Sequence, residues 1–152
     1  MTDRDDVLDL VARSADAVNR LDAEQFESLW TPEATWVIDP PLDFALEGSR
    51  AEIAKGFEAG MRAMWASFLQ LIHSTTVDID GDTATARTYL TEQGIRPDGT
   101  GQVLHGVYED TVVRTDEGWR FARRHFRYLY LDQPQLGGQA AATGTFGLPV
   151  AP

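Results

Sequence analysis

Three histidines and several carboxylates are the side chains of this sequence that could move protons near neutral pH. His73 lies in residues 71–92, where apolar and polar side chains alternate on both sides of Asp80-Gly81. This pattern predicts a β-hairpin closed by a tight turn. Because alternate side chains of a strand share a face, we expect His73 to face inward with Leu71 and Val77. A histidine on an apolar inner face is a candidate general acid or base.

The length of the hairpin loop decides which side chains of the second strand share the face of His73. A two-residue loop pairs His73 with Thr88 and turns Glu92 inward with the alanines and leucine of its strand, whereas a three-residue loop turns the opposite set inward. The two-residue loop is favoured because it buries alanine and leucine and exposes Arg87. Glu92 is then a carboxylate beside a pocket, where it could act as acid, base or orienting group.

The strand predicted over residues 102–114 carries two sets of polar side chains on opposite faces. His105 shares one face with two valines, and Tyr108 and Asp110 share the other. Only one set can line a cavity. We favour His105 inside and interpret Tyr108 and Asp110 as structural.

The last predicted strand, residues 119–131, is unusually rich in long polar side chains. The parity set by Trp119 and Phe121 turns Arg127 inward unless a bulge intervenes. An inward arginine would bind a carboxylate, an enolate or a carbonyl oxygen. The alternative is that the cations of this strand neutralise acidic groups across a subunit interface.

Helical spacing and capping residues predict the elements that must position these groups. Thr2 with Asp5 and Ser49 with Glu52 resemble capping boxes, and helices are expected over residues 7–20, from 22 to before Pro32, and over 49–69. The apolar stripe of the third helix should form a pocket wall. The predicted strands are 34–39, 71–79, 82–92, 102–114 and 119–131, and residues 42–48 form an irregular loop.

This order of elements is typical of an α+β domain in which a cone-shaped, curved antiparallel sheet wraps around N-terminal helices. Residues 1–131 would form that domain. Residues 132–152 are rich in Gly, Ala and Pro and are expected to be a packed arm or a flexible tail. An open curved sheet also leaves an outer face to bury, which favours a homodimer or homotrimer.

Composition narrows the classes of partner. The chain has 24 acidic and 13 basic residues, a formal net charge of −11 and no cysteine. This charge disfavours nucleic acid and anionic membranes. No phosphate-binding glycine loop and no metal-ligand spacing is recognisable, so no cofactor is expected. No apolar run approaches the roughly 20 residues that span a bilayer, and the N-terminus lacks a signal-peptide pattern, so we expect a soluble cytoplasmic protein.

Several short segments, taken in order, resemble a known family. They are residues 10–36, Ile72-His73, the Asp80-Gly81-Asp82-Thr83-Ala84 turn, residues 106–110 and residues 118–121. Across about residues 5–131 the chain resembles the SnoaL-like branch of the nuclear transport factor 2-like superfamily. This resemblance implies the cone-shaped α+β fold with an enclosed pocket. The fold hosts dehydratases, isomerases, cyclases and non-catalytic binding subunits, so it does not settle the function.

The resemblance also implies roles for single residues. His73 matches the catalytic histidine of scytalone-dehydratase-like and bile-acid-dehydratase-like members, and Asn19 stands where they carry the aspartate that orients it. Ser14 replaces a frequent substrate-binding tyrosine. Glu92 matches an acidic position of the bile-acid dehydratases, and Asp39 resembles the base-bearing strand end of ketosteroid isomerases, although an aspartate before proline is also a common turn residue.

The sequence therefore predicts a cofactor-independent lyase, isomerase or cyclase that uses histidine acid–base chemistry on a hydrophobic polycyclic or polyketide-like molecule. The alternative is a non-catalytic small-molecule-binding or accessory subunit. The predicted catalytic residues are His73, Asn19, Glu92 and Asp39. The predicted substrate-binding residues are Ser14, Trp36, Phe57, Met61, Trp65, Tyr89, His105 and Arg127.

Overall fold

The computed structural model describes residues 2–138, so most of the predicted C-terminal arm, residues 139–152, lies outside the described part of the chain. Within that part the helices are α1 (Asp3–Arg20), α2 (Ala23–Ser28) and α3 (Arg50–Met64). The strands are β1 (Trp30–Ile38), β2 (Phe44–Ser49), β3 (Ser67–Asp80), β4 (Thr83–Ile95), β5 (Gly101–Thr115) and β6 (Gly118–Asp132).

The two long helices begin where their capping residues predict. In α1 the Thr2 hydroxyl accepts from the Asp5 backbone N–H at 3.2 Å, and the Asp5 carboxylate accepts from the Thr2 N–H at 2.9 Å. Ser49 and Glu52 form the same reciprocal pair at the start of α3. Each box satisfies backbone donors that a helix start otherwise leaves free. None of the helices in residues 2–138 is long and apolar enough to span a membrane.

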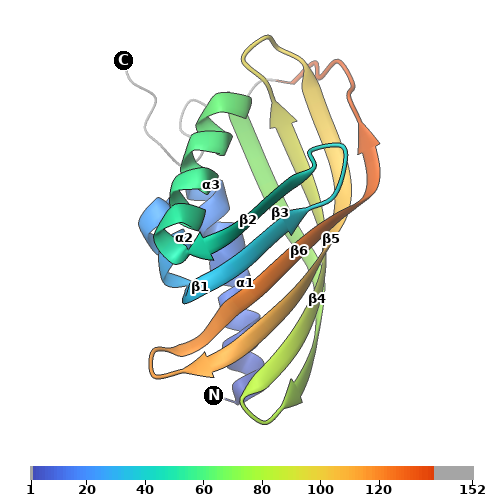
Figure 1. Ribbon diagram of the computed structural model, residues 1–152. Coiled ribbons are helices and arrows are strands. Elements are labelled where there is room, and N and C mark those ends of the chain that lie inside the picture. Colours follow the sequence, from blue (N-terminus) through green and yellow to red (C-terminus); the bar gives the residue numbers. More distant parts are fainter. Residues whose placement is uncertain (1, 139–152) are drawn as a thin grey trace.

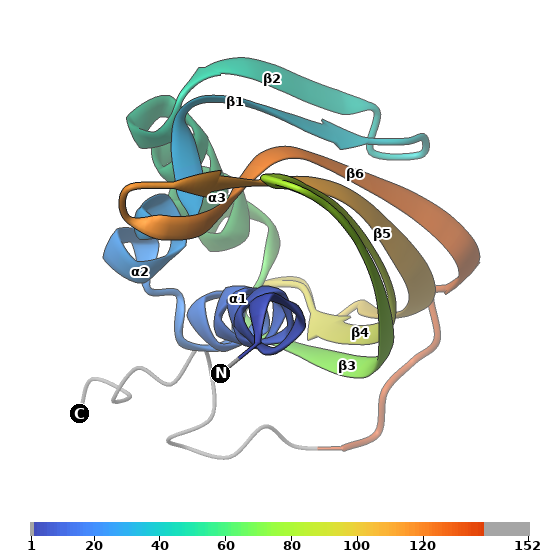
Figure 2. The ribbon, with the colours of Figure 1, turned by 90° about the horizontal axis from the view of Figure 1, so that it is seen from below.

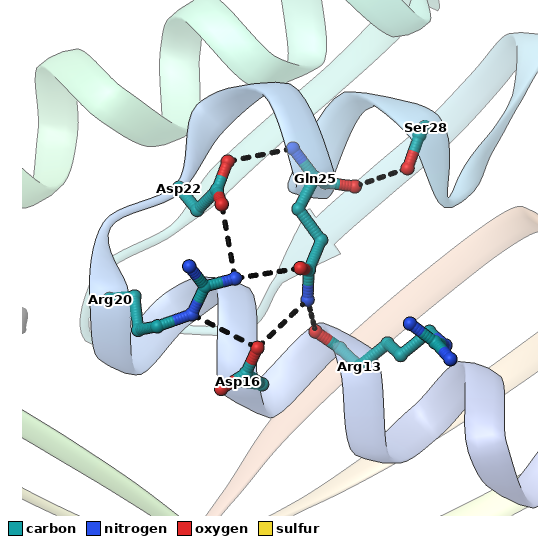
Figure 3. A network of polar contacts seen from close by, with 6 residues as sticks. All are labelled: Arg13, Asp16, Arg20, Asp22, Gln25 and Ser28. Carbon is teal, nitrogen blue, oxygen red and sulfur yellow. Dashed lines mark hydrogen bonds and ion pairs between the residues drawn. The ribbon is translucent and has the colours of Figure 1, made fainter.

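The corner between α1 and α2 is fixed by a polar network, shown in Figure 3. Arg20 lies between the carboxylates of Asp16 and Asp22, at 3.1 and 3.0 Å. Gln25 donates from its side-chain amide to the Arg13 backbone carbonyl at 2.9 Å. Since these pairs are mostly solvent-exposed, their contribution is geometric: they set the angle at which α2 leads into the sheet.

The six strands form one sheet in the order β2-β1-β6-β5-β4-β3. Neighbouring strands are antiparallel except β1 and β6, which are parallel. The sheet is strongly curved and open, and α1 and α3 lie on its concave side (Figures 1 and 2). The predicted α+β class with a curved sheet around N-terminal helices is confirmed.

Three predicted element boundaries were wrong. Residues 42–48 were expected to be a loop, but β2 pairs with β1, for example Leu46 with Trp36. Strand β1 begins at Trp30, inside the segment assigned to the second helix. The third helix ends at Met64, because Ser67 already pairs with Ile95 on β4. Sheet pairing outweighs local helical spacing at these positions, as tertiary contacts often do.

The central hairpin keeps the predicted two-residue loop, but the loop consists of Gly81 and Asp82. Gly81 has φ of 60°, a conformation that glycine adopts without strain. The register therefore differs by two residues from the prediction, with Ile79 opposite Ala84 instead of Asp82. Because side chains alternate with a period of two, this shift leaves the predicted inward set of β4 unchanged.

A β-bulge at His73 changes which residues of β3 face inward. Ile72 pairs with Leu90 and Ser74 pairs with Tyr89, so His73 has no partner on β4. An extra residue inverts the alternation on one side of the bulge. Towards the N-terminal end of the strand the inward residues are thus Gln70 and Ile72, instead of Leu71 and His73.

A second irregularity lies on β6, where the sequence left a bulge open. Val112 pairs with Phe121 but Thr111 pairs with Arg123, so Ala122 is the extra residue. Beyond it the inward side chains include Arg124, which is 2 % exposed, whereas Arg123 is exposed. This bulge also turns Arg127 to the outer face.

Candidate active site

The inner face of the sheet and α3 enclose a cavity of about 470 Å³, within the usual range of small-molecule sites. Its walls are mainly aromatic and aliphatic. Four predicted substrate-binding residues, Trp36, Phe57, Met61 and Trp65, line it. Other lining residues are Phe44, Phe68, Tyr108, Phe126, Tyr128 and Leu131. An apolar, ring-sized molecule fits this lining.

Three polar side chains meet in this apolar cavity, one each from β3, β4 and β5. Gln70 donates from its amide nitrogen to the Glu92 carboxylate at 2.7 Å and to the Tyr108 hydroxyl at 3.4 Å. Gln70 is 2 % exposed, and its carbonyl oxygen has no hydrogen-bond partner among the described residues. The three residues are called the inner trio below.

Glu92 supplies the carboxyl group of the inner trio. Burial raises the pKa of its carboxyl from 4.5 to about 7, and the hydrogen bond from Gln70 opposes that shift only in part. Desolvation disfavours the charged form, and no cation among residues 2–138 forms an ion pair with this carboxyl. A carboxyl group with this pKa exists in both forms near neutral pH, as an acid–base catalyst requires.

Tyr108 is held over a buried ion pair. The Arg124 guanidinium lies 4.0 Å from the centre of the Tyr108 ring and forms two 2.9 Å hydrogen bonds with Asp110. Burial raises the pKa of the Tyr108 hydroxyl most, and the charge of Glu92 raises it further, whereas the charge of Arg124 lowers it. The phenol therefore stays protonated at neutral pH and can donate a hydrogen bond.

Asn19 positions the inner trio from α1. Its side-chain amide donates to the Gln70 backbone carbonyl at 2.8 Å and accepts from the Gln70 N–H at 2.7 Å. This pair of bonds ties α1 to β3 at the residue that reaches into the cavity. The expectation that Asn19 orients His73 was wrong, because the Asn19 amide bonds to the Gln70 backbone and His73 lies on the outer face.

The predicted inward placement of His73 and His105 was also wrong. Both imidazoles are exposed on the outer face of the sheet. His73 Nε2 lies 2.6 Å from the Thr91 hydroxyl, and His105 Nδ1 lies 2.9 Å from the same oxygen. His73, Thr91 and His105 form what is called the outer trio below. The bulge at His73 explains the first error, and the inward pairing of Asp110 with Arg124 explains the second.

The remaining predicted residues are also placed away from the cavity. Tyr89 is 44 % exposed on the outer face, and Arg127 pairs there with Glu109 at 3.0 Å. Ser14 is buried but accepts from Arg124 at 3.0 Å. Asp39 directly follows β1 and accepts from His125 at 2.7 Å.

Sequence reasoning missed Gln70 and assigned Tyr108 to structure alone. Tyr108 could have been found, since it belonged to the alternative face of its strand. Gln70 gave no signal, because a strict period of two turns it outward. Among residues 2–138, no group of three or more His, Asp or Glu side chains is arranged to hold a metal ion.

Comparison with known proteins supports the fold. Residues 1–125 match the family model described as SnoaL-like domain. The uncharacterized protein Rv2910c of Mycobacterium tuberculosis is 26% identical over 126 residues, 82% of this chain and 84% of that protein. The structure of a putative aromatic ring hydroxylase from Novosphingobium aromaticivorans is 26% identical, with a TM-score of 0.79 over 87% of this chain and 93% of that chain.

A third comparison concerns fold alone. The hexachlorocyclohexane dehydrochlorinase LinA-type3 from Novosphingobium barchaimii is 19% identical, with a TM-score of 0.76 over 90% of this chain and 91% of that chain. The curved sheet with helices on its concave side is therefore shared with proteins of quite different sequence.

Proposed function

The chain belongs to the SnoaL-like domain family, and we propose that it is an enzyme that removes a proton from the carbon next to a carbonyl group in a hydrophobic small molecule. Isomerisation follows if the proton returns to another carbon, and dehydration or a related elimination follows if a neighbouring group leaves. Glu92 is the base in this proposal. The resemblance to the SnoaL-like branch is confirmed, whereas the expected histidine chemistry is replaced by carboxylate chemistry.

The observation that carries the proposal is a single carboxyl group facing an apolar cavity. Glu92 hydrogen-bonds to the amide of Gln70 alone among the described residues. Desolvation keeps its pKa near 7. A carboxylate in water is a weak base for a C–H group, and raising its pKa to the working pH makes proton transfer more favourable without losing the ionised fraction.

Tyr108 supplies the complementary group. Its hydroxyl accepts from Gln70 at 3.4 Å, which leaves the phenol proton for another acceptor. Removing a proton next to a carbonyl puts negative charge on the carbonyl oxygen. A preorganised donor in an apolar site stabilises that charge strongly. The guanidinium of Arg124 under the ring makes the phenol a better donor, and Arg124 acts here as a positioning residue.

Gln70 can serve both protonation states of Glu92. While Glu92 is ionised, the amide N–H donates to it. Once Glu92 holds the proton, a half-turn of the amide lets the carbonyl oxygen of Gln70, which has no partner among the described residues, accept from the carboxylic acid. The base is therefore held in place before and after proton transfer.

The proposal can be tested without knowing the physiological substrate. The probe is 2-tetralone, a neutral bicyclic ketone, and the measurement is exchange of its α-hydrogens for deuterium in D₂O, followed by NMR. The wild-type protein should accelerate exchange. Glu92→Gln should reduce the acceleration by about 10²–10⁴-fold, because the base is lost. Tyr108→Phe should reduce it by about 10²-fold, because one donor to the oxyanion is lost.

Two variants of the outer face serve as matched controls. Glu109→Gln removes a carboxylate from the strand of Tyr108 but on the other face, and His73→Ala removes the histidine that the sequence favoured. Both should exchange at the wild-type rate. No acceleration by the wild-type protein, or an unchanged rate in Glu92→Gln, would overturn the proposal, and binding of the ketone without exchange would favour a binding subunit.

A further inference from the structure

Arg96 lines the same cavity, just beyond the end of β4, and its guanidinium is held in a fixed position. It donates to the side-chain oxygen of Gln102 at 2.6 Å and lies 4.9 Å from the centre of the Trp65 ring. Gln102 is 7 % exposed and Trp65 is 8 % exposed. The cation is therefore oriented by two buried residues of the cavity wall. An arginine that is held in position in this way is preorganised to bind an anionic group.

No carboxylate among the described residues lies within ion-pair distance of Arg96. Eight other arginines form ion pairs: Arg13, Arg20, Arg50, Arg62, Arg87, Arg114, Arg124 and Arg127. Of the arginines without an ion pair among the described residues, Arg4 and Arg120 donate to backbone carbonyls, and Arg123 is exposed on the outer face. Asp98 lies nearby, and the Arg96 charge contributes a little to the lowered pKa of its carboxyl. The Asp98 carboxylate, however, accepts its hydrogen bond from the Thr100 N–H, at 2.9 Å. Arg96 is thus a half-buried arginine that lines the cavity and has no acidic partner among the described residues.

The position of Arg96 relative to Glu92 sets the size of a molecule that could contact both. The two residues are four positions apart, so their Cα atoms are separated by at most about 13 Å along an extended strand. Tyr128, another residue of the cavity wall, senses both charges: burial raises the pKa of its hydroxyl, Glu92 raises it further and Arg96 lowers it. Tyr128 therefore lies in range of both groups, and the apolar wall continues between them.

We propose that Arg96 binds an acidic group of the substrate, so that the substrate class is a ring-containing hydrophobic acid with its carboxylate at Arg96 and its reacting carbon at Glu92. This inference deepens the proposed function and rests on it, because the bound acid is a substrate only if the proposed reaction takes place. The chemistry is that of a carboxylate accepting charge-assisted hydrogen bonds from a guanidinium that is already oriented. The aromatic walls would hold the rings in between.

The experiment compares two probes with the same ring system and similar size, one anionic and one neutral. The probes are 2-naphthoate and 2-naphthamide, with binding measured by calorimetry at pH 6, where most of the Glu92 carboxyl is neutral. The wild-type protein should bind naphthoate about 10- to 100-fold more tightly, as expected for hydrogen bonds to a charged group. In Arg96→Met the ratio should fall to about one, because the carboxylate loses its charge-assisted hydrogen bonds to the guanidinium.

The control is Arg123→Met, which removes an exposed arginine from the outer face of β6 and should leave the ratio unchanged. Glu92→Gln should also keep the preference for naphthoate, which separates this inference from the proposed catalysis. Equal binding of the two probes by the wild-type protein, or a preference that survives in Arg96→Met, would overturn the proposal that Arg96 binds the acidic group. If neither probe binds the wild-type protein, both the anchor and the proposed pocket are wrong.

Discussion

The inner and outer trios come from the same three strands, and each contains a side chain able to transfer protons, yet the two trios lie in different surroundings. Gln70, Glu92 and Tyr108 lie on the concave face, and His73, Thr91 and His105 lie at nearby positions on the convex face. Both sets are hydrogen-bonded. The difference is the medium: the inner carboxyl is desolvated among aromatic rings, whereas the outer imidazoles are in water. Residue type alone would have favoured the histidines.

The comparison extends to ion pairs on the two faces of β6. Arg124 and Asp110 form a pair on the inner face whose side chains are 2 % and 0 % exposed, and Arg127 pairs with Glu109 on the outer face with side chains 43 % and 35 % exposed. Water solvates the outer charges whether or not they pair. The inner charges depend on each other, because burial without a partner is costly.

The largest expected effect follows from that difference. Arg124→Met should lower the free energy of unfolding by about 3–5 kcal/mol, because it leaves the Asp110 carboxylate buried without its cation. Arg127→Met should change it by less than about 1 kcal/mol. Urea denaturation of both variants beside the wild-type protein gives the two values. Equal losses would mean that the two faces do not differ in solvation as described.

A smaller effect concerns the pH dependence of stability. The pKa of Glu92 is raised from 4.5 to about 7 in the folded protein, so its protonated form favours folding. The stabilisation relative to an ionised carboxyl is fully present below about pH 4.5 and is lost as the pH rises through about 7. At pH 8 the loss amounts to roughly 3 kcal/mol, at 1.36 kcal/mol per pKa unit.

Glu92→Gln should remove this dependence. The variant should be more stable than the wild-type protein at pH 8, by up to roughly 3 kcal/mol, and about as stable at pH 4.5. Thermal unfolding of both proteins across this pH range measures the difference, with Glu109→Gln as the outer-face control. A wild-type protein that gains stability relative to Glu92→Gln as the pH rises would contradict the raised pKa.

The sequence was sufficient for the fold class, for the inward side of β4 with Glu92, and for four apolar residues of the cavity wall, but not for Gln70 or for the facing of the histidines. Capping boxes at Thr2 and Ser49 and the alternation around Ala84, Ala86 and Leu90 are local features, and they were predicted correctly. The facing of β3 and β6 depends on single-residue bulges at His73 and Ala122, which leave the composition of a strand unchanged. The bulge at His73 turns Gln70 inward and His73 outward, and the predicted histidine chemistry therefore does not apply to the cavity.

Strand β2 and the end of α3 failed for a related reason. The segment around Leu46 is a strand because it pairs with β1. The helix ends at Met64 because the residues that follow pair with β4. In both places tertiary contacts select between local conformations of similar free energy. The local sequence does not determine this choice, because it depends on pairing with segments distant in the chain.

The central claim is that Glu92, and not a histidine, is the titrating group of the cavity. The direct measurement is a titration of the side-chain carboxyl carbons by ¹³C NMR, with the Glu92 resonance assigned by its absence from Glu92→Gln. We predict an apparent pKa of about 7 for this carboxyl. A Glu92 carboxyl that titrates near 4.5, the ordinary value for glutamate, would contradict the claim and remove the base from the proposed reaction.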